Sequence, residues 1–443
     1  MRRAGASLAA AAAAAAAVAA VAACGKKQRQ TRTTDAAPVE LVSVAALGDG
    51  GVARPGETEE REPNDGADVA TALAPGAVVR ARIEPDADLD YYRIDVAGAG
   101  GLSVQVSAAP GADLSLEIED AAGTTLAKSD RGGANVAEGV PNLGVTPGRY
   151  LAIVRKKPAP VKKSARGRRG APPPPEPAPG SGPAYEITAQ VAPFGKNAEH
   201  EPDDDRGTAN DLIIGDTVTG YVGWTGDADV WKLSTEALTA KNVLDLELGP
   251  VEGIALSVEI ADGIGQTLVS RKAPRGAALV VRGLLPVVTQ GAPPFHYVTV
   301  RADRSNPEAA YQLKVTGQPI GTDPELEPND TPERAMPIPA DRTVINDASW
   351  TPGDVDCYAI PPDPNARTLD ISIDTPAESD LRAELFVNGR SVAKADQKGK
   401  GVAEKISGQV PENGRAIVCI RGSDASREGR YNLGFQEGPA KAP

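Results

Sequence analysis

One acidic hexapeptide pattern occurs three times in the 443-residue sequence, and this repetition constrains the architecture more than any other feature. Its general form is Glu-x-Glu-Pro-(Asn/Asp)-Asp, at residues 60–65, 199–204 and 325–330. Each copy is followed by a second acidic cluster, Asp-x-Asp next to aromatic residues, at residues 88–92, 227–231 and 354–358. From the Glu before the Pro to the first Asp of the cluster, the separations are 26, 26 and 27 residues. The sequence therefore predicts three copies of one folding unit.

The residues after each acidic cluster indicate what that unit is. Short runs alternate apolar and polar residues and are separated by turns, at Gly123 in the first copy, Gly265 in the second and Asn388-Gly389 in the third. An alternation of period two around such turns is typical of β-hairpins. Each copy then ends with one strand closing on an Arg and a last strand opened by a Tyr, namely Arg155 and Tyr185, Arg301 and Tyr311, Arg421 and Tyr431. We expect an all-β chain of antiparallel sandwiches, about 120 residues each.

Composition supports short strands and argues against several functions. The chain has 47 Gly and 39 Pro but only 4% aromatic residues, which suits small cores with many turns. Its net charge of -13 argues against nucleic acid as the main partner, because phosphate binding needs a basic surface. Only two histidines occur, His200 and His296, and the sequence has no HExxH, GxSxG or P-loop string. We therefore expect a protein that is not an enzyme.

The two linked motifs resemble the bacterial pre-peptidase C-terminal domain, a relative of the collagen-binding modules of clostridial collagenases. The signature of that family pairs an EPN(D/N) entry with DxDY(Y/F) at the start of a strand. The resemblance covers about residues 57–438 and implies a jelly-roll-like β-sandwich for each copy. Such domains usually follow a secreted peptidase, and no peptidase precedes them here. The expected modules span residues 57–193, 196–318 and 322–438.

The acidic motifs are candidate calcium ligands. Ca²⁺ takes about six to eight oxygen ligands and favours several carboxylates with a carbonyl or amide oxygen. Calcium-binding members of the family take ligands from the entry motif and from the Asp residues before the aromatic. Without a cation, carboxylates gathered in this way would repel and raise one another's pKa. The resemblance thus implies Ca²⁺ ligands at Glu60, Glu62, Asn64, Asp88 and Asp90; at Glu199, Glu201, Asp203, Asp227 and Asp229; and at Glu325, Glu327, Asn329, Asp354 and Asp356.

Other interpretations of these motifs remain open at this point. Pro-Asn-Asp can be a turn at a module boundary, with Asp-x-Asp a solvated strand start. A glycosidase also uses paired carboxylates, but three regularly spaced copies fit a structural element better than a unique active site. Residues 86–90 look like the start of an EF-hand loop. That alternative fails because Tyr91 stands where a Gly is required and Ala97 where a Glu is required.

The N-terminal residues have the pattern of a targeting signal. Basic residues at positions 2 and 3 precede an apolar stretch at 8–23, which predicts an export signal over residues 1–23. The string Val21-Ala22-Ala23-Cys24 resembles the lipobox of bacterial lipoproteins, which implies diacylglycerol on Cys24 and a membrane anchor. Lys26 is not the Asp that retains many lipoproteins at the inner membrane, which favours the outer membrane. An ordinary secretory peptide with a chance Cys is the alternative. Residues 24–56 are predicted to be a flexible tether.

Two further features belong to single copies. Cys357 and Cys419 both fall in predicted strands of the third copy. They could form a disulfide or remain two separate buried thiols, and the sequence leaves both alternatives open. Residues 156–183 insert seven basic residues, one acid and nine prolines into the first copy. This composition predicts a disordered extension. It could hold an anionic polymer or membrane surface, or have no partner.

The sequence as a whole predicts an exported, lipid-anchored, non-enzymatic protein of three calcium-stiffened β-sandwich modules. Its expected role is binding or scaffolding in the cell envelope. The expected partners are the membrane, through the N-terminal lipid, and an envelope protein or polysaccharide. The alternative is an accessory subunit of a secreted peptidase or another exported enzyme.

Overall fold

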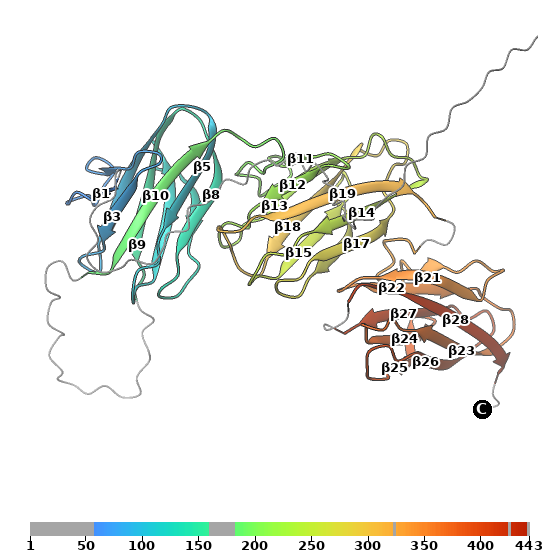
Figure 1. Cartoon of the computed structure of the whole chain (residues 1–443). Coiled ribbons are helices and arrows are strands. Elements are labelled where there is room, and N and C mark those ends of the chain that lie inside the picture. The colour runs from blue at the N-terminus through green and yellow to red at the C-terminus, as the bar shows by residue number, and fades with distance from the viewer. Residues whose placement is uncertain (1–56, 159–181, 322–324, 424–426, 441–443) are drawn as a thin grey trace, which may run out of the picture. The chain divides into compact units, whose positions relative to one another are not determined.

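A computed structural model describes residues 57–158, 182–321, 325–423 and 427–440, and every helix or strand assigned in these ranges is a β-strand. The strands form six sheets that pair into three sandwiches (Figure 1), here called the first module (β1–β10), the second module (β11–β19) and the third module (β20–β28). The export signal, Cys24, the tether and most of the basic segment lie outside the described residues. Within the described ranges, no helix has the length and apolarity needed to cross a membrane.

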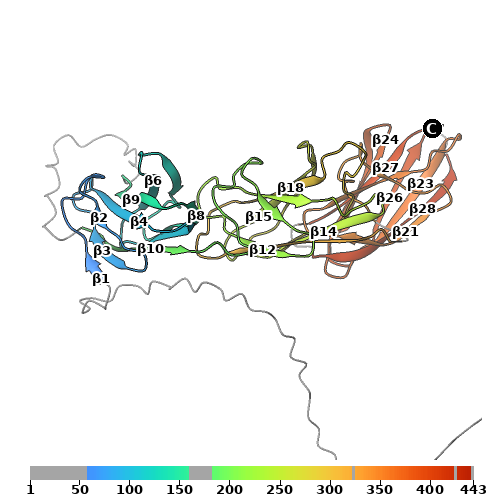
Figure 2. The same cartoon turned by 90° about the horizontal axis from the view of Figure 1, so that it is seen from above.

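The first module has one sheet in the order β1-β3-β10-β5-β8 and another in the order β2-β4-β9-β6-β7. The view in Figure 2 separates these two layers, with β3 and β10 in one and β4, β6 and β9 in the other. The strands are β1 (Glu57–Glu59), β2 (Thr71–Ala72), β3 (Val78–Arg82), β4 (Leu89–Val96), β5 (Gly100–Val106), β6 (Leu114–Asp120), β7 (Thr125–Ser129), β8 (Glu138–Val145), β9 (Gly148–Lys156) and β10 (Ala184–Ala192).

The second and third modules repeat this arrangement. Their sheet orders are β12-β19-β14-β17 with β11-β13-β18-β15-β16, and β21-β28-β23-β26 with β20-β22-β27-β24-β25. At the place of β1 the second module has a single parallel bridge, between Ala198 and Thr219, and the equivalent residues 322–324 of the third module lie outside the described ranges. The second module contains β11 (Asn210–Leu212), β12 (Thr217–Gly220), β13 (Asp229–Ser234), β14 (Asn242–Leu248), β15 (Leu256–Ala261), β16 (Thr267–Lys272), β17 (Leu279–Leu284), β18 (Phe295–Ala302) and β19 (Tyr311–Pro319). The third contains β20 (Met336–Pro337), β21 (Val344–Trp350), β22 (Val355–Ile360), β23 (Arg367–Asp374), β24 (Leu381–Val387), β25 (Arg390–Ala395), β26 (Glu404–Val410), β27 (Ala416–Gly422) and β28 (Gly429–Pro439).

The prediction of an all-β chain with three sandwiches is confirmed, and the structure adds short parallel edges. The long strands pair antiparallel, but β2, β11 and β20 run parallel to β4, β13 and β22. In each module the chain crosses to the opposite sheet, through β3, β12 or β21, before it returns. Such a crossover is what parallel neighbours need, whereas a tight hairpin can join only antiparallel ones.

Each module buries its own apolar core between its two sheets, as the alternation in its strands requires. In β23, Leu369, Ile371 and Ile373 are at most 2% exposed, whereas the residues between them face solvent. The β24–β25 hairpin turns at Asn388-Gly389, where both residues have positive φ, 51° and 76°. A two-residue hairpin turn of this kind favours Asn and Gly because both tolerate that conformation.

A disulfide joins Cys357 of β22 to Cys419 of β27, which are direct register partners with Cα atoms 4.0 Å apart. With Ile417 they form a small buried cluster apart from the main core of the third module. Of the seven basic residues predicted for the inserted segment, two are described and paired. Lys156 lies 2.5 Å from Asp86, and Lys157 forms an ion pair with Asp130.

Candidate metal sites

The entry motif lies beside the start of the Asp-x-Asp strand in all three modules. The backbone N–H of the residue after the second Asp donates to the carbonyl of the fifth residue of the motif, over 3.1 Å in every copy. The Glu-Pro peptide bond is cis in each motif. The pairs are Tyr91 with Asn64, Val230 with Asp203, and Cys357 with Asn329.

The Glu that precedes the Pro is held in one orientation by its own turn. One of its carboxylate oxygens accepts the backbone N–H two residues further on, over 2.9 Å in the first and second modules and 2.8 Å in the third. The other oxygen remains available to the cluster. In the second module that atom, Oε1 of Glu201, is buried and has no hydrogen-bond partner.

The second Asp of each Asp-x-Asp points into the sandwich because side chains alternate along the strand. Asp90, Asp229 and Asp356 are all 0% exposed. The Tyr at the start of the last strand lies against this Asp: Tyr185 donates to Asp90, and Tyr431 donates to Asp356 over 2.7 Å. In the second module a side-chain hydrogen bond from Tyr311 lowers the pKa of Asp229, against the larger effect of burial. The sequence singled out these tyrosines only as strand starts, and it missed this contact.

Three carboxylates in each module offer oxygen atoms that lie within 4.8 Å of one another. In the first two modules the triad consists of both motif Glu residues and the inner Asp, whereas in the third it consists of one Glu and two Asp residues. Thirteen of the fifteen predicted ligands, including Asp88, Asp203 and Asp227, are at most 8% exposed, whereas Glu60 is half-buried and Glu62 is exposed. Each triad is named by its residues: Glu60, Glu62 and Asp90; Glu199, Glu201 and Asp229; Glu327, Asp330 and Asp354.

The remaining predicted ligands surround the triads and are partly engaged by protein groups. Both oxygens of Asp88 accept backbone N–H groups, from Glu84 over 2.7 Å and from Leu89 over 3.0 Å. The amide of Asn329 donates to Glu325 over 2.7 Å. The sequence did not predict Asp330, although it is the last residue of the repeated motif.

Burial raises the pKa of these carboxyl groups strongly, and neighbouring negative charges add to the effect. In the first module burial raises the pKa of Glu60 to about 7 and that of Asp90 to about 8. In the second module it raises the pKa of Glu201 and of Asp227 to about 9. The pKa of Asp229 lies well above its ordinary value for the same reasons.

Several oxygens in the first two clusters are buried without a hydrogen-bond partner. Without a cation, carboxyl groups with such raised pKa values hold protons at neutral pH, and once ionised they only accept hydrogen bonds. None of the ion pairs found among the described residues involves a carboxylate of these two triads. Because a buried charge is costly unless it is paired, these clusters fit a bound cation. The unpartnered atoms are Oδ1 of Asn64, Oδ1 of Asp90, Oε2 of Glu199, Oε1 of Glu201, Oδ1 of Asp203 and Oδ1 of Asp227.

The third cluster contains a cation supplied by the preceding module. Arg271 of β16, only 4% exposed, donates through Nη2 to Glu327 and, over 2.5 Å, to Asp354. Its Nη1 donates to Asp330, also over 2.5 Å. Burial alone would lower the pKa of Arg271, but Asp354, Glu327 and Asp330 raise it above its ordinary value, so the group stays charged. Nothing in the repeat pattern pointed to this residue.

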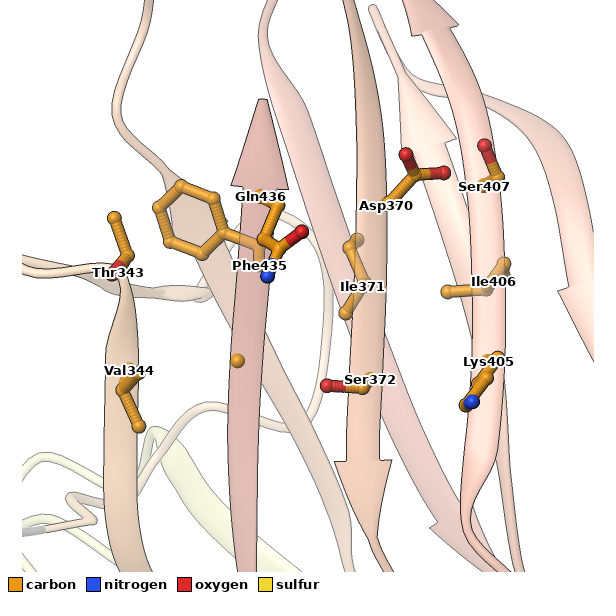
Figure 3. Close-up of a pocket in the computed structure, with 11 residues that line it drawn as sticks. Thr343, Val344, Asp370, Ile371, Ser372, Lys405, Ile406, Ser407, Phe435 and Gln436 are labelled. Atoms are coloured by element: carbon orange, nitrogen blue, oxygen red, sulfur yellow. The ribbon is translucent and has the colours of Figure 1, made fainter. Parts of the chain in front are cut away.

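A different feature lies on the outer face of the β21-β28-β23-β26 sheet, where a groove of about 670 Å³ opens (Figure 3). Exposed polar side chains line it from three adjacent strands, and buried residues between them face the core. The polar side chains are Asp370, Ser372, Lys405, Ser407 and Gln436.

Two of the positions that line this groove, Ser372 and Gly434, carry small side chains. Gly434, three residues after the Tyr of the last strand, pairs with Ser372. At the same place in the second module, Lys314 pairs with Glu247, and both of these side chains are long. A Cβ added to Gly434 would meet Ser372 Oγ at 3.5 Å, which is ordinary contact, so this position accepts a side chain.

The fold and the buried clusters define this chain as a tandem array of β-sandwich modules with acidic sites. No family model matches the sequence, and no curated protein matches it. Among solved structures, the pre-peptidase C-terminal domain of the Bacillus anthracis collagenase aligns with 27% of this chain and 94% of that domain, at 14% identity and a TM-score of 0.20.

Two tandem structures are also similar. The CUB1-EGF-CUB2 domains of human MASP-1/3 align with 55% of this chain and 99% of that one, at 10% identity and a TM-score of 0.16. The tandem CBM22 domains of Paenibacillus barcinonensis Xyn10C align with 47% and 82%, at 11% identity and a TM-score of 0.16. These are distant similarities that assign no function, so the function has to be argued from the side chains.

Proposed function

We propose that the chain is a non-enzymatic, lipid-anchored protein of the cell envelope whose β-sandwich modules bind a ligand and are stiffened by calcium. The observation that supports calcium most directly is the set of buried carboxylate oxygens without partners in the first two modules. A divalent cation would supply the positive charge and the coordination bonds that these oxygens lack.

The chemistry of the donors favours Ca²⁺ over other metals. All the side-chain donors are hard oxygens, from carboxylates and from the amide of Asn64 in the first module. Mg²⁺ prefers a small octahedral shell with several waters, whereas Ca²⁺ accepts many carboxylates at irregular angles. The ion would bind the entry segment to the strand it lies beside and so rigidify the start of the module.

The experiment is a calcium titration of the full chain, by calorimetry and by native mass spectrometry, with CaCl₂ as the probe. Extracellular sites of this kind bind at about 10⁻⁴ to 10⁻³ M. Glu201→Gln with Asp229→Asn should remove one bound ion. The matched control is Glu236→Gln with Asp211→Asn, two exposed carboxyl groups of the same module, which should remove none. A wild-type chain that binds no calcium up to 10-fold above about 10⁻³ M would refute the proposal.

We propose that the ligand binds in the groove of the third module. Its serines, Gln436, Asp370 and Lys405 offer both hydrogen-bond donors and acceptors, which suits a polysaccharide rich in hydroxyl groups. Purified envelope polysaccharide should bind the wild type, and Gly434→Lys, which copies Lys314, should bind at least tenfold more weakly. Thr188→Lys, at the same position in the first module, is the control. Equal binding by both variants would exclude the groove, and binding only to envelope proteins would exclude a polysaccharide.

Anchoring follows from the lipobox-like string and is tested separately. Cys24→Ala should move the protein from the membrane fraction to the soluble fraction, because only the thiol of Cys24 can accept the diacylglycerol. An unmodified N-terminus at another residue, found by mass spectrometry of the wild type, would contradict this assignment.

A further inference from the structure

We propose that Arg271 takes the place of the metal ion in the third acidic cluster, so that the chain binds calcium at two of its three repeated sites. This inference rests on the proposed calcium sites of the first two modules. It predicts that the three copies of the motif together form two metal sites and one site occupied by an internal ion pair.

The first step is that Arg271 binds the same carboxylates that would have to coordinate a metal ion. Its guanidinium contacts Glu327, Asp330 and Asp354, and these are the three carboxylates that converge in the third module. The Arg271 side chain is 2% exposed, and the contacting side chains of Glu327 and Asp354 are 1% and 5% exposed. A guanidinium and a Ca²⁺ ion cannot both occupy this enclosed set of oxygens.

The second step is that the cluster has rearranged around the guanidinium. In the first two modules the triad contains both Glu residues of the motif and the inner Asp. In the third module Glu325 and Asp356 are outside the triad, with Glu325 bonded to the amide of Asn329 and Asp356 to the hydroxyl of Tyr431. Asp330, whose counterparts are outside the other triads, joins it instead.

The third step is that the position of the first module that corresponds to Arg271 carries no basic residue. Arg271 pairs in register with Val258, and the residue at the same register position of the first module, opposite Leu116, is Ser129. The two positions face equivalent neighbours, because the strand that follows forms a backbone bridge to the next motif in both cases, Leu143 to Glu201 and Leu284 to Glu327. Ser129 donates its hydroxyl to Glu138 and brings no charge.

The experiment counts bound calcium on the full chain by native mass spectrometry and calorimetry, with CaCl₂ as the probe. The wild type should bind two ions, and Arg271→Ala should bind three because the carboxylates are freed. Arg271→Lys keeps the positive charge and should stay at two. Arg275→Ala is the matched control, because Arg275 pairs with Asp303 within the second module, and it should also stay at two.

Each outcome decides the inference, and it does so separately from the proposed function. Three ions on the wild type, or two on both the wild type and Arg271→Ala, would overturn the inference while the calcium sites of the first modules stand. No ion on the wild type but one on Arg271→Ala would refute the proposed function and support the inference. No ion on either would refute both. If Arg271→Ala does not fold, Arg271→Met, which keeps the apolar stem, replaces it in the count.

Discussion

The second and third modules carry the same acidic motif in the same fold, yet their clusters are neutralised in different ways. In the second module Asp229 is fully buried, and none of the ion pairs found among the described residues involves it. In the third, Arg271 supplies hydrogen bonds and charge to three carboxylates. The difference depends on a residue outside the motif, so a repeated ligand pattern does not by itself make every copy a metal site.

The largest expected effect comes from removing the internal cation. Arg271→Ala in the presence of a chelator leaves buried carboxylates unpaired, and breaking a buried ion pair in this way costs about 3–5 kcal/mol. Scanning calorimetry should show the third module unfolding at a lower temperature, with the second module unchanged. Added calcium should restore part of the loss. An unchanged third transition in chelator would mean that the ion pairs are not needed.

The next effect concerns the disulfide of the third module, which the other two modules do not have. Cys357 and Cys419 close a loop with a sequence separation of 62 residues. Removing a disulfide of this kind costs about 2–4 kcal/mol. Cys357→Ala with Cys419→Ala should therefore lower the third transition alone. A dithiothreitol treatment of the wild type serves as the control, and a shift of the second transition would contradict the assignment.

Calcium should have the complementary effect on the second module. An ion that binds only the native state adds about 1.4 kcal/mol at ten times its dissociation constant. The transition of the second module should rise between chelator and saturating calcium, and Glu201→Gln with Asp229→Asn should abolish that rise. The third transition should move less than the second. Equal shifts of both would show that Arg271 does not distinguish the two clusters.

Much of this architecture could be predicted from the sequence, because short stretches of residues determine the strands and turns. The alternation around residues 369–373 and the Asn388-Gly389 turn each specify a strand or a hairpin by short-range chemistry. The pairing of entry motif and Asp-x-Asp strand could be expected from their constant spacing. The candidate ligands came from the resemblance to the pre-peptidase C-terminal domain, carried over onto the residues of the motif.

The site residues that could not be predicted are those whose role depends on contacts with residues far away in the sequence. Arg271 lies 56 residues before Glu327 and reads as one more polar residue of a strand. Tyr185 lies 95 residues after Asp90, and only the closed sandwich brings its hydroxyl to that carboxylate. Gly434 and Ser372, which line the groove, likewise become neighbours only across two strands. Pattern analysis of single segments has no access to such pairs.

The smallest expected effect, taken for each titrating group, is a pH dependence of the metal-free second module. Burial holds the native pKa of Glu201 and of Asp227 at about 9 and that of Asp203 at about 7, above the ordinary values of the unfolded chain. Between those values the native state binds more protons than the unfolded state, so the free energy of unfolding falls as pH rises. From pH 7.0 to 7.5 the loss is about 0.7 kcal/mol for each extra proton that the native state holds.

Denaturant unfolding of the full chain in chelator, at these two pH values, measures this slope for the second transition. Calcium should flatten the slope, because the ion replaces the protons that otherwise neutralise the cluster. Glu201→Gln with Asp229→Asn should flatten it in part without calcium, since fewer carboxyl groups remain to titrate. Stability that rises with pH in chelator would show that these carboxylates already have a positive partner, and the contrast between the second and third modules would then be wrong.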